Sequence, residues 1–113
     1  MLEQQRAICA RYGVEPVAAP DHWKVGVALN VKHGLQPLNG LRLQPNGDTS
    51  GWYLWAGEDF SDDPDFFVPL HIAHLPTWSP QAIPYLQLPP GWRFLVAPGY
   101  EDIWHDPQLL TRS

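Results

Sequence analysis

The sequence predicts an α+β domain in which a mostly antiparallel sheet carries two short helices packed on one face. Three observations lead to this fold class. Apolar residues alternate in segments of strand length, 13 prolines and nine glycines divide the chain into short pieces, and two segments have the features of a helix. Proline removes a backbone donor and glycine favours turns, so long helices are not expected. Strands joined by turns then make up most of the fold.

The first helix is expected over residues 2–12. This segment contains good helix formers, places Leu2, Ile8, Cys9 and Tyr12 roughly on one side, and is followed by glycine, on which helices commonly end. The connector after it should be extended, because its two prolines bias the residues before them away from helical geometry.

The clearest strand lies in the segment "WKVGVALNVKHG". Val25, Val27, Leu29 and Val31 alternate with small or polar residues, which is the period of a strand with one buried face. Two turn signals follow, Asn-Gly at 39–40 and Pro-Asn-Gly at 45–47. Both predict tight reversals, and the residues between them are expected to form a short strand or one arm of a bulged hairpin.

The segment "GWYLWAG" at 51–57 predicts a second strand, aromatic and bounded by glycines. Trp52 and Leu54 should lie on one face, and Tyr53 and Trp55 on the other.

The rest of the chain predicts an edge strand, a second helix and two final strands. Pro69 restricts any strand in "FFVPLHIAHL" to an edge of the sheet. Ser79 is expected to cap a helix that starts at Pro80 and ends before the double proline at 89–90. Segments 91–99 and 100–106 are the expected final strands.

Length and composition set further bounds. The 113 residues fit one domain spanning residues 1–113. The chain lacks a run of about 18 apolar residues that would cross a bilayer, and its first 13 residues do not form a secretory signal, so a cytoplasmic location is expected. The single cysteine, Cys9, cannot form an internal disulfide.

The net charge of −5 is unevenly distributed. Residues 1–57 hold four acids and five bases, which gives +1, whereas residues 58–113 hold eight acids and two bases, which gives −6. The second half should repel nucleic acid, whose binding depends on Lys and Arg at phosphates. It should attract a basic partner.

The common nucleotide, redox and zinc-protease motifs do not occur. No cofactor and no bound metal are therefore expected. A second hypothesis is a small metal-dependent hydrolase built on His71 and His74, three residues apart, with the carboxylates of 62–65 upstream and His105 and Asp106 downstream. Structural or surface histidines are favoured over this hydrolase, because the spacing matches no known ligand set.

Two further catalytic arrangements can be drawn from the sequence. A carboxyl pair such as Glu58 and Glu101 would suit glycoside hydrolysis, but no pair is singled out. Cys9 would suit a nucleophile beside His22 or His33, although a lone cysteine in an amphipathic helix more often lies in the core.

The aromatic residues divide into two groups. Trp52, Trp92 and Phe94 lie in predicted strands and should be in the core. Trp55 and Trp78 are flanked by turn signals and are the better candidates for exposure, although a core position is favoured even for them. A carbohydrate-binding module using exposed tryptophans is a third hypothesis.

The most informative segment is "GEDFSDDPDFF". It contains five acids within eight residues and no base, which costs self-repulsion unless solvent or a partner relieves it. It predicts either a solvated loop or a docking surface, in which the acids steer a partner and neighbouring Trp55 and Phe60 anchor it. A calcium loop is disfavoured because the EF-hand spacing and its glycine are missing.

The segments "SGWYLWAGE", "DDPDFF", "PLHIAHL" and "GWRFLVAPGYEDIW", taken together, resemble small bacterial immunity proteins found beside polymorphic toxins. The resemblance covers residues 35–104. It implies a cytoplasmic binding protein without catalysis that occupies a toxin's active site or substrate surface and protects the producing cell.

The leading hypothesis is therefore a non-catalytic immunity protein that binds and neutralises a cognate toxin, such as a nuclease with a basic active-site cleft. The resemblance supplies no agreed binding residues, so the expected contact residues come from charge and aromatic content: Glu58, Asp59, Asp62, Asp63, Asp65, Trp55, Phe60 and Trp78.

Overall fold

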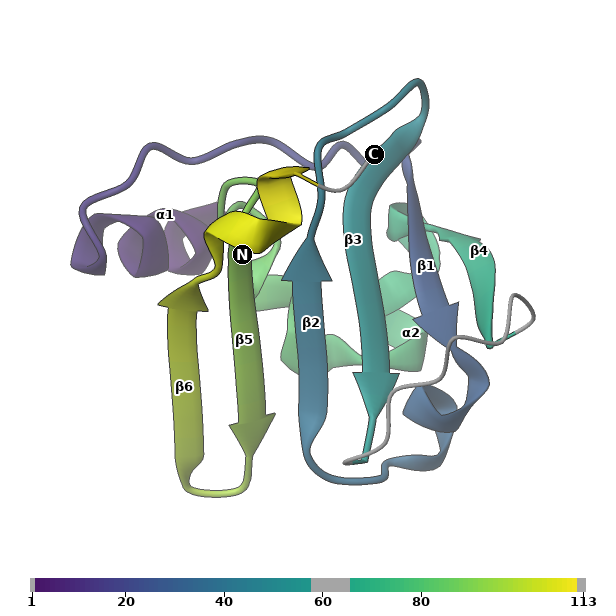
Figure 1. Cartoon of the computed structure of the whole chain (residues 1–113). Helices are drawn as coiled ribbons and strands as arrows, with labels where there is room; N and C mark the ends of the chain where they lie inside the picture. Colours follow the sequence, from purple (N-terminus) through teal and green to yellow (C-terminus); the bar gives the residue numbers. More distant parts are fainter. Residues whose placement is uncertain (1, 58–65, 112–113) are drawn as a thin grey trace.

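The computed structural model describes residues 2–57 and 66–111. The elements run α1 (Leu2–Arg11), β1 (Lys24–Ala28), η1 (Leu29–His33), β2 (Leu38–Arg42), β3 (Thr49–Ala56), β4 (Phe67–His71), η2 (Ile72–His74), α2 (Leu75–Trp78), η3 (Pro80–Tyr85), β5 (Trp92–Ala97), β6 (Tyr100–His105) and η4 (Pro107–Thr111), where η marks a 3₁₀ helix. One mostly antiparallel sheet carries α1, α2 and η3 on one face (Figure 1). The predicted α+β fold class is confirmed.

The sheet has the strand order β4-β1-β3-β2-β5-β6. β1 and β3 pair in parallel, and the other neighbours pair antiparallel. β4 lies at an edge, as Pro69 predicted, because proline has no N–H to donate to a second neighbour. The faces of β3 also follow the prediction: Trp52 contacts Phe94 on the helix side, whereas Tyr53 contacts Phe67 on the other.

The core lies between the sheet and the helix layer. Trp52 and Phe94 are fully buried there, and Trp92 packs against them half-buried, so the three predicted core aromatics are confirmed. The indole Nε1 of Trp52 donates to the Leu86 carbonyl over 2.9 Å. This bond ties the central strand to the segment after η3.

α1 docks on η3 and on the segment that follows it. Gln5 Nε2 donates to the Ile83 carbonyl over 2.8 Å, and the Cys9 thiol contacts the Gln87 carbonyl at 3.3 Å. The helix was predicted correctly, and its contact face was predicted in part: Cys9 is buried and Ile8 packs on the core, whereas Leu2 and Tyr12 are exposed and Gln5 is buried. A hydrogen-bonded glutamine thus replaces part of the expected apolar face.

Arg42, in β2, is fully buried at 0% exposure. Its guanidinium lies 5.7 Å from the Trp52 ring centroid and points into the core. None of the ion pairs among the described residues involves it. Its N–H groups donate instead to five backbone carbonyls at 2.7–3.2 Å, those of Val17, Ala18, Ser50, Leu86 and Leu88.

Three local predictions were wrong. The strand from Val25 ends at Ala28, and Leu29 and Val31 belong to η1. Asn39 and Gly40 lie inside β2 rather than in a turn, because they pair with both β3 and β5. Glycine is needed at position 40 because the Phe94 ring occupies the space of a side chain there. The second helix is the 3₁₀ helix η3, and Ser79 makes no side-chain capping bond to it.

Among the described residues, no helix is long and apolar enough to cross a membrane.

Candidate functional site

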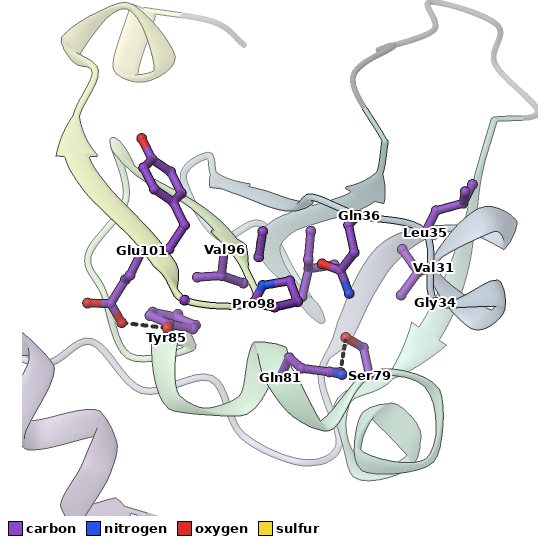
Figure 2. A pocket seen from close by; sticks show the side chains of 14 residues that line it. Val31, Gly34, Leu35, Gln36, Ser79, Gln81, Tyr85, Val96, Pro98 and Glu101 are labelled. Atoms are coloured by element: carbon purple, nitrogen blue, oxygen red, sulfur yellow. Dashed lines mark hydrogen bonds between the residues drawn. The ribbon is translucent and has the colours of Figure 1, made fainter.

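A groove opens at the end of the sheet where β5 turns into β6 (Figure 2). The connection from η1 to β2, the residues of η3 and the β5–β6 turn form its sides. The groove encloses about 550 Å³, a volume typical of ligand sites. Its walls are largely apolar and include Val31, Leu35, Leu38, Val96, Ala97 and Pro98.

One end of the groove carries its charge. Tyr85 Oη donates to Glu101 Oε2 over 2.6 Å, and Arg11 Nη2 donates to Glu101 Oε1 over 2.7 Å. Among the described lining residues, Glu101 is the one that is charged at neutral pH. Figure 2 shows Glu101 and Tyr85 at this end and Leu35 and Gly34 at the other.

Tyr85 holds the carboxylate in place. Its ring stacks on Phe94 with centroids 4.5 Å apart and an interplanar angle of 19°. Burial, and then the hydrogen bond to Glu101, raise the pKa of Tyr85 far above its ordinary value. The phenol therefore keeps its proton, and its O–H group donates a hydrogen bond that fixes the orientation of the Glu101 carboxylate.

Two large apolar side chains flank the groove and remain accessible to solvent. Leu35 is 52% exposed and Tyr100 is 55% exposed. Gln36, Ser79 and Gln81 add amide and hydroxyl groups to the lining. Apolar walls with a few fixed polar groups are the usual composition of a binding site.

The predicted acidic residues Glu58, Asp59, Asp62, Asp63 and Asp65, and the predicted anchor Phe60, lie outside the described residues. The residue before them is firmly held. Gly57 N donates to the Pro37 carbonyl over 2.9 Å, and Asn39 Nδ2 donates to the Gly57 carbonyl over 2.8 Å. Gln36 and Leu38, the neighbours of Pro37 in the chain, line the groove. Gly57 therefore lies next to the connection between η1 and β2, which forms one side of the groove.

The other two predicted anchors do not lie on one surface. Trp55 is buried at 4% exposure, so its suggested exposure is wrong and the favoured core position is confirmed. Trp55 contacts Phe67 on the face of β3 that points away from the helix layer, whereas Trp78 belongs to α2. α2 lies within the helix layer (Figure 1). Trp78 is half-buried, and its ring centroid lies 4.7 Å from Lys32 Nζ.

Aromatic rings and one arginine gather on the helix-free face of the sheet. Phe67 packs against Tyr53, Trp55 and Phe66, with ring centroids 4.9–6.4 Å apart. The Arg93 guanidinium lies 6.0 Å from the Trp55 centroid and also 5.4 Å from that of Trp104. This half-buried cluster covers the face that no helix of α1, α2 or η3 reaches.

That guanidinium is also paired with Asp106. Arg93 Nη1 lies 3.2 Å from Asp106 Oδ2. The arginine is therefore held between two aromatic rings and a carboxylate, which fixes the position of its charge on this face.

The histidines suggested for a metal-dependent hydrolase are accessible but not joined by further ligands. The ring centroids of His71 and His74 lie 6.3 Å apart, and both side chains are exposed. His105 ends β6, at the edge of the sheet opposite β4 and His71. Over residues 2–57 and 66–111, no three His, Cys, Asp or Glu side chains are grouped to hold a metal ion.

The structure also places the suggested cysteine nucleophile, the suggested sugar-binding tryptophans and one member of the carboxyl pair. Cys9 is fully buried, and burial raises the pKa of its thiol, so it resembles a core residue more than a nucleophile. Trp55 is buried and Trp78 is half-buried, so these two candidates do not supply a row of exposed rings for a sugar. Glu101 lies at the groove, whereas Glu58 lies outside the described residues.

Sequence reasoning missed the groove. Tyr85 and Glu101 meet across 16 positions of sequence, and Glu101 meets Arg11 across 90. A local signal did exist: the turns at Gly34 and Gly99, both with positive φ, form part of the lining. That signal marks two turns, but it does not say that they lie next to each other.

Comparison with known proteins gives one match. The family model described as the Imm33-like domain matches residues 4–106. No curated protein and no solved structure matches the chain. The matched range includes the N-terminal helix and first strand, which lie outside the range of the sequence resemblance.

Proposed function

The chain belongs to the Imm33-like domain family, and from this membership we propose that it is a non-catalytic immunity protein that binds a cognate bacterial toxin and neutralises it. It acts in the cytoplasm of the producing cell, where it blocks the active site or the substrate surface of the toxin. The family match over residues 4–106 is the observation that carries the proposal.

The charge distribution supports a basic partner. The chain has a net charge of −5, and five of its 12 acids fall within residues 58–65, where there is no base. A concentrated negative field raises the association rate with a positively charged surface. The substrate cleft of a nuclease is such a surface, because it binds phosphates.

The contact surface we assign is centred on the acidic residues Glu58, Asp59, Asp62, Asp63 and Asp65. Two features support this position. The segment starts after Gly57, which Pro37 and Asn39 hold beside the groove. Phe66 follows the segment and packs on Phe67. Phe60 is the anchor we retain from the sequence, and Trp78 is a peripheral one. Trp55 supports the surface from within, because it is buried.

The test starts by finding the toxin. The tagged protein is used as bait in a lysate of the source organism, and a stoichiometric partner that high salt releases is identified by mass spectrometry. That partner is then expressed in a test bacterium with and without this chain. Growth arrest relieved by co-expression is the expected result, and arrest that persists despite equal amounts of both proteins would contradict the proposal.

A pair of charge variants distinguishes the proposed contact surface from the total charge of the protein. Asp62→Asn with Asp63→Asn changes the charge of the proposed surface, whereas Glu3→Gln with Glu15→Gln removes two exposed charges from the N-terminal part. The first pair should weaken the complex and the second should not. Equal weakening by both pairs would mean that total charge, rather than this surface, governs binding.

A further inference from the structure

We propose that the groove at the β5–β6 turn receives an arginine side chain of the protein partner, with the guanidinium on Glu101 and the aliphatic stem along the apolar wall. This inference rests on the proposed function and adds to it the chemical identity of one partner residue. It concerns the described residues of the groove.

The charge of the groove fits a cation. Glu101 is charged at neutral pH, and no base is among the described residues that line the groove. Tyr85 fixes this carboxylate through a hydrogen bond of 2.6 Å. A carboxylate that is already oriented binds a cation with less loss of side-chain entropy.

The carboxylate has room for another donor. Within the described part of the chain, each of its oxygens has one partner, Tyr85 on Oε2 and Arg11 on Oε1. An ionised carboxylate offers about four lone-pair positions, so about two remain. Glu101 already accepts one guanidinium, from Arg11, and the side chain of Arg11 is 54% exposed. The geometry of this carboxylate is therefore compatible with arginine.

The rest of the groove fits the body of an arginine. Its stem of three methylene groups can bury itself on Val96 and Pro98 while the head stays polar.

The first experiment uses a small probe and needs no toxin. The peptide N-acetyl-Gly-Arg-Gly-amide is titrated into the ¹⁵N-labelled protein, and the matched peptide with citrulline, which is neutral and nearly the same shape, is the control. We expect saturable shifts of the Gly34, Gly99 and Glu101 amides at millimolar arginine peptide, and shifts at least about tenfold smaller with citrulline. Equal shifts with both peptides, or no shifts at the groove, would overturn the proposal.

Three variants test the assigned residue. Glu101→Gln should abolish the difference between the two peptides. Asp102→Asn removes the neighbouring acid of β6, which does not line the groove, and should leave the difference intact. Arg11→Gln removes the competing cation and should tighten binding of the arginine peptide severalfold. Equal behaviour of Glu101→Gln and Asp102→Asn, in proteins with unchanged thermal midpoints, would refute the assignment.

A second readout distinguishes this inference from the proposed function. Once the toxin is known, Glu101→Gln should weaken the complex by roughly 30-fold, as expected for a central contact of an interface. If Glu101→Gln binds the toxin and protects the cell as well as the wild-type protein does, the role of the groove is refuted and the immunity role is not. A wild-type protein that protects against no toxin would refute the immunity role, and the peptide titration would still report on the groove.

Discussion

Replacing Arg42 by methionine should lower the free energy of unfolding by about 2–5 kcal/mol, because each buried carbonyl that loses its donor costs about 1–3 kcal/mol. The guanidinium is fully buried and donates to five carbonyls. Burial lowers its pKa to about 10, so it is still charged at neutral pH. Hydrogen bonds from a charged donor contribute about 1.5–3 kcal/mol each, and desolvation of the charge offsets much of their sum.

The cost comes from the carbonyls that lose their donor. The Leu86 carbonyl keeps the Trp52 indole as a partner, and those of Val17 and Ala18, in half-buried or exposed residues, can turn to water. The carbonyl of buried Leu88 has no such replacement within the described part of the chain, which alone costs about 1–3 kcal/mol. The loss is a large share of a total stability of about 5–15 kcal/mol.

Urea unfolding followed by tryptophan fluorescence measures this change. Arg42→Lys should lose less than Arg42→Met, because lysine keeps the charge but has three donors in place of five. Arg6→Met, on the exposed side of α1, is the matched control and should change stability by no more than about 0.5 kcal/mol. A loss below about 1 kcal/mol for Arg42→Met would refute the assigned role of the five hydrogen bonds.

Three further predictions concern other groups. Cys9 in the native protein should react with a thiol reagent roughly 100-fold more slowly than in urea, because it is buried and burial raises its pKa; native and unfolded rates within tenfold of each other would contradict its core position. The raised pKa of Tyr85 means that the folded protein keeps a proton that the unfolded chain releases above about pH 10, so stability is unaffected below that pH and falls as the pH rises above it. Between about pH 9 and about pH 11, the free energy of unfolding in urea should fall less for Tyr85→Phe than for the wild-type protein. Equal falls in the two proteins would contradict the raised pKa of Tyr85. Asp62→Asn with Asp63→Asn should slow association with the toxin severalfold and reduce its salt dependence while dissociation stays nearly the same, as measured by surface plasmon resonance; unchanged association kinetics would remove these acids from the contact surface.

Strand positions and faces could be predicted where the chain itself contains the cause. The period of two in residues 51–57 reports which side chains share a face, and it placed Trp52 and Tyr53 on opposite sides correctly. Pro69 placed its strand at an edge, because a missing N–H has the same consequence in any tertiary context.

Prediction failed where a distant segment decides the local structure. Asn39-Gly40 has the composition of a turn, but it pairs with β3 and with β5, which lies more than 50 residues later, and the glycine makes room for the Phe94 ring. An arginine between two leucines is typical of a strand with one exposed face, so the sequence does not indicate that Arg42 is buried. The carbonyls that allow its burial come from separate parts of the chain. Tyr85 and Glu101 likewise meet through the fold, so their groove has no contiguous motif.

The docking of α1 on η3 and on the segment that follows it has a consequence for how the chain reaches its native state. The bonds from Gln5 to Ile83 and from Cys9 to Gln87 each span 78 positions, and β2 pairs with β5, which follows that segment. Contacts of this range form slowly, because a long loop must close before they can contribute. During synthesis the first helix has no surface to pack on until residue 87 has left the ribosome. Newly made chains should therefore become resistant to proteases only late in synthesis, when β5 and β6 can join the sheet.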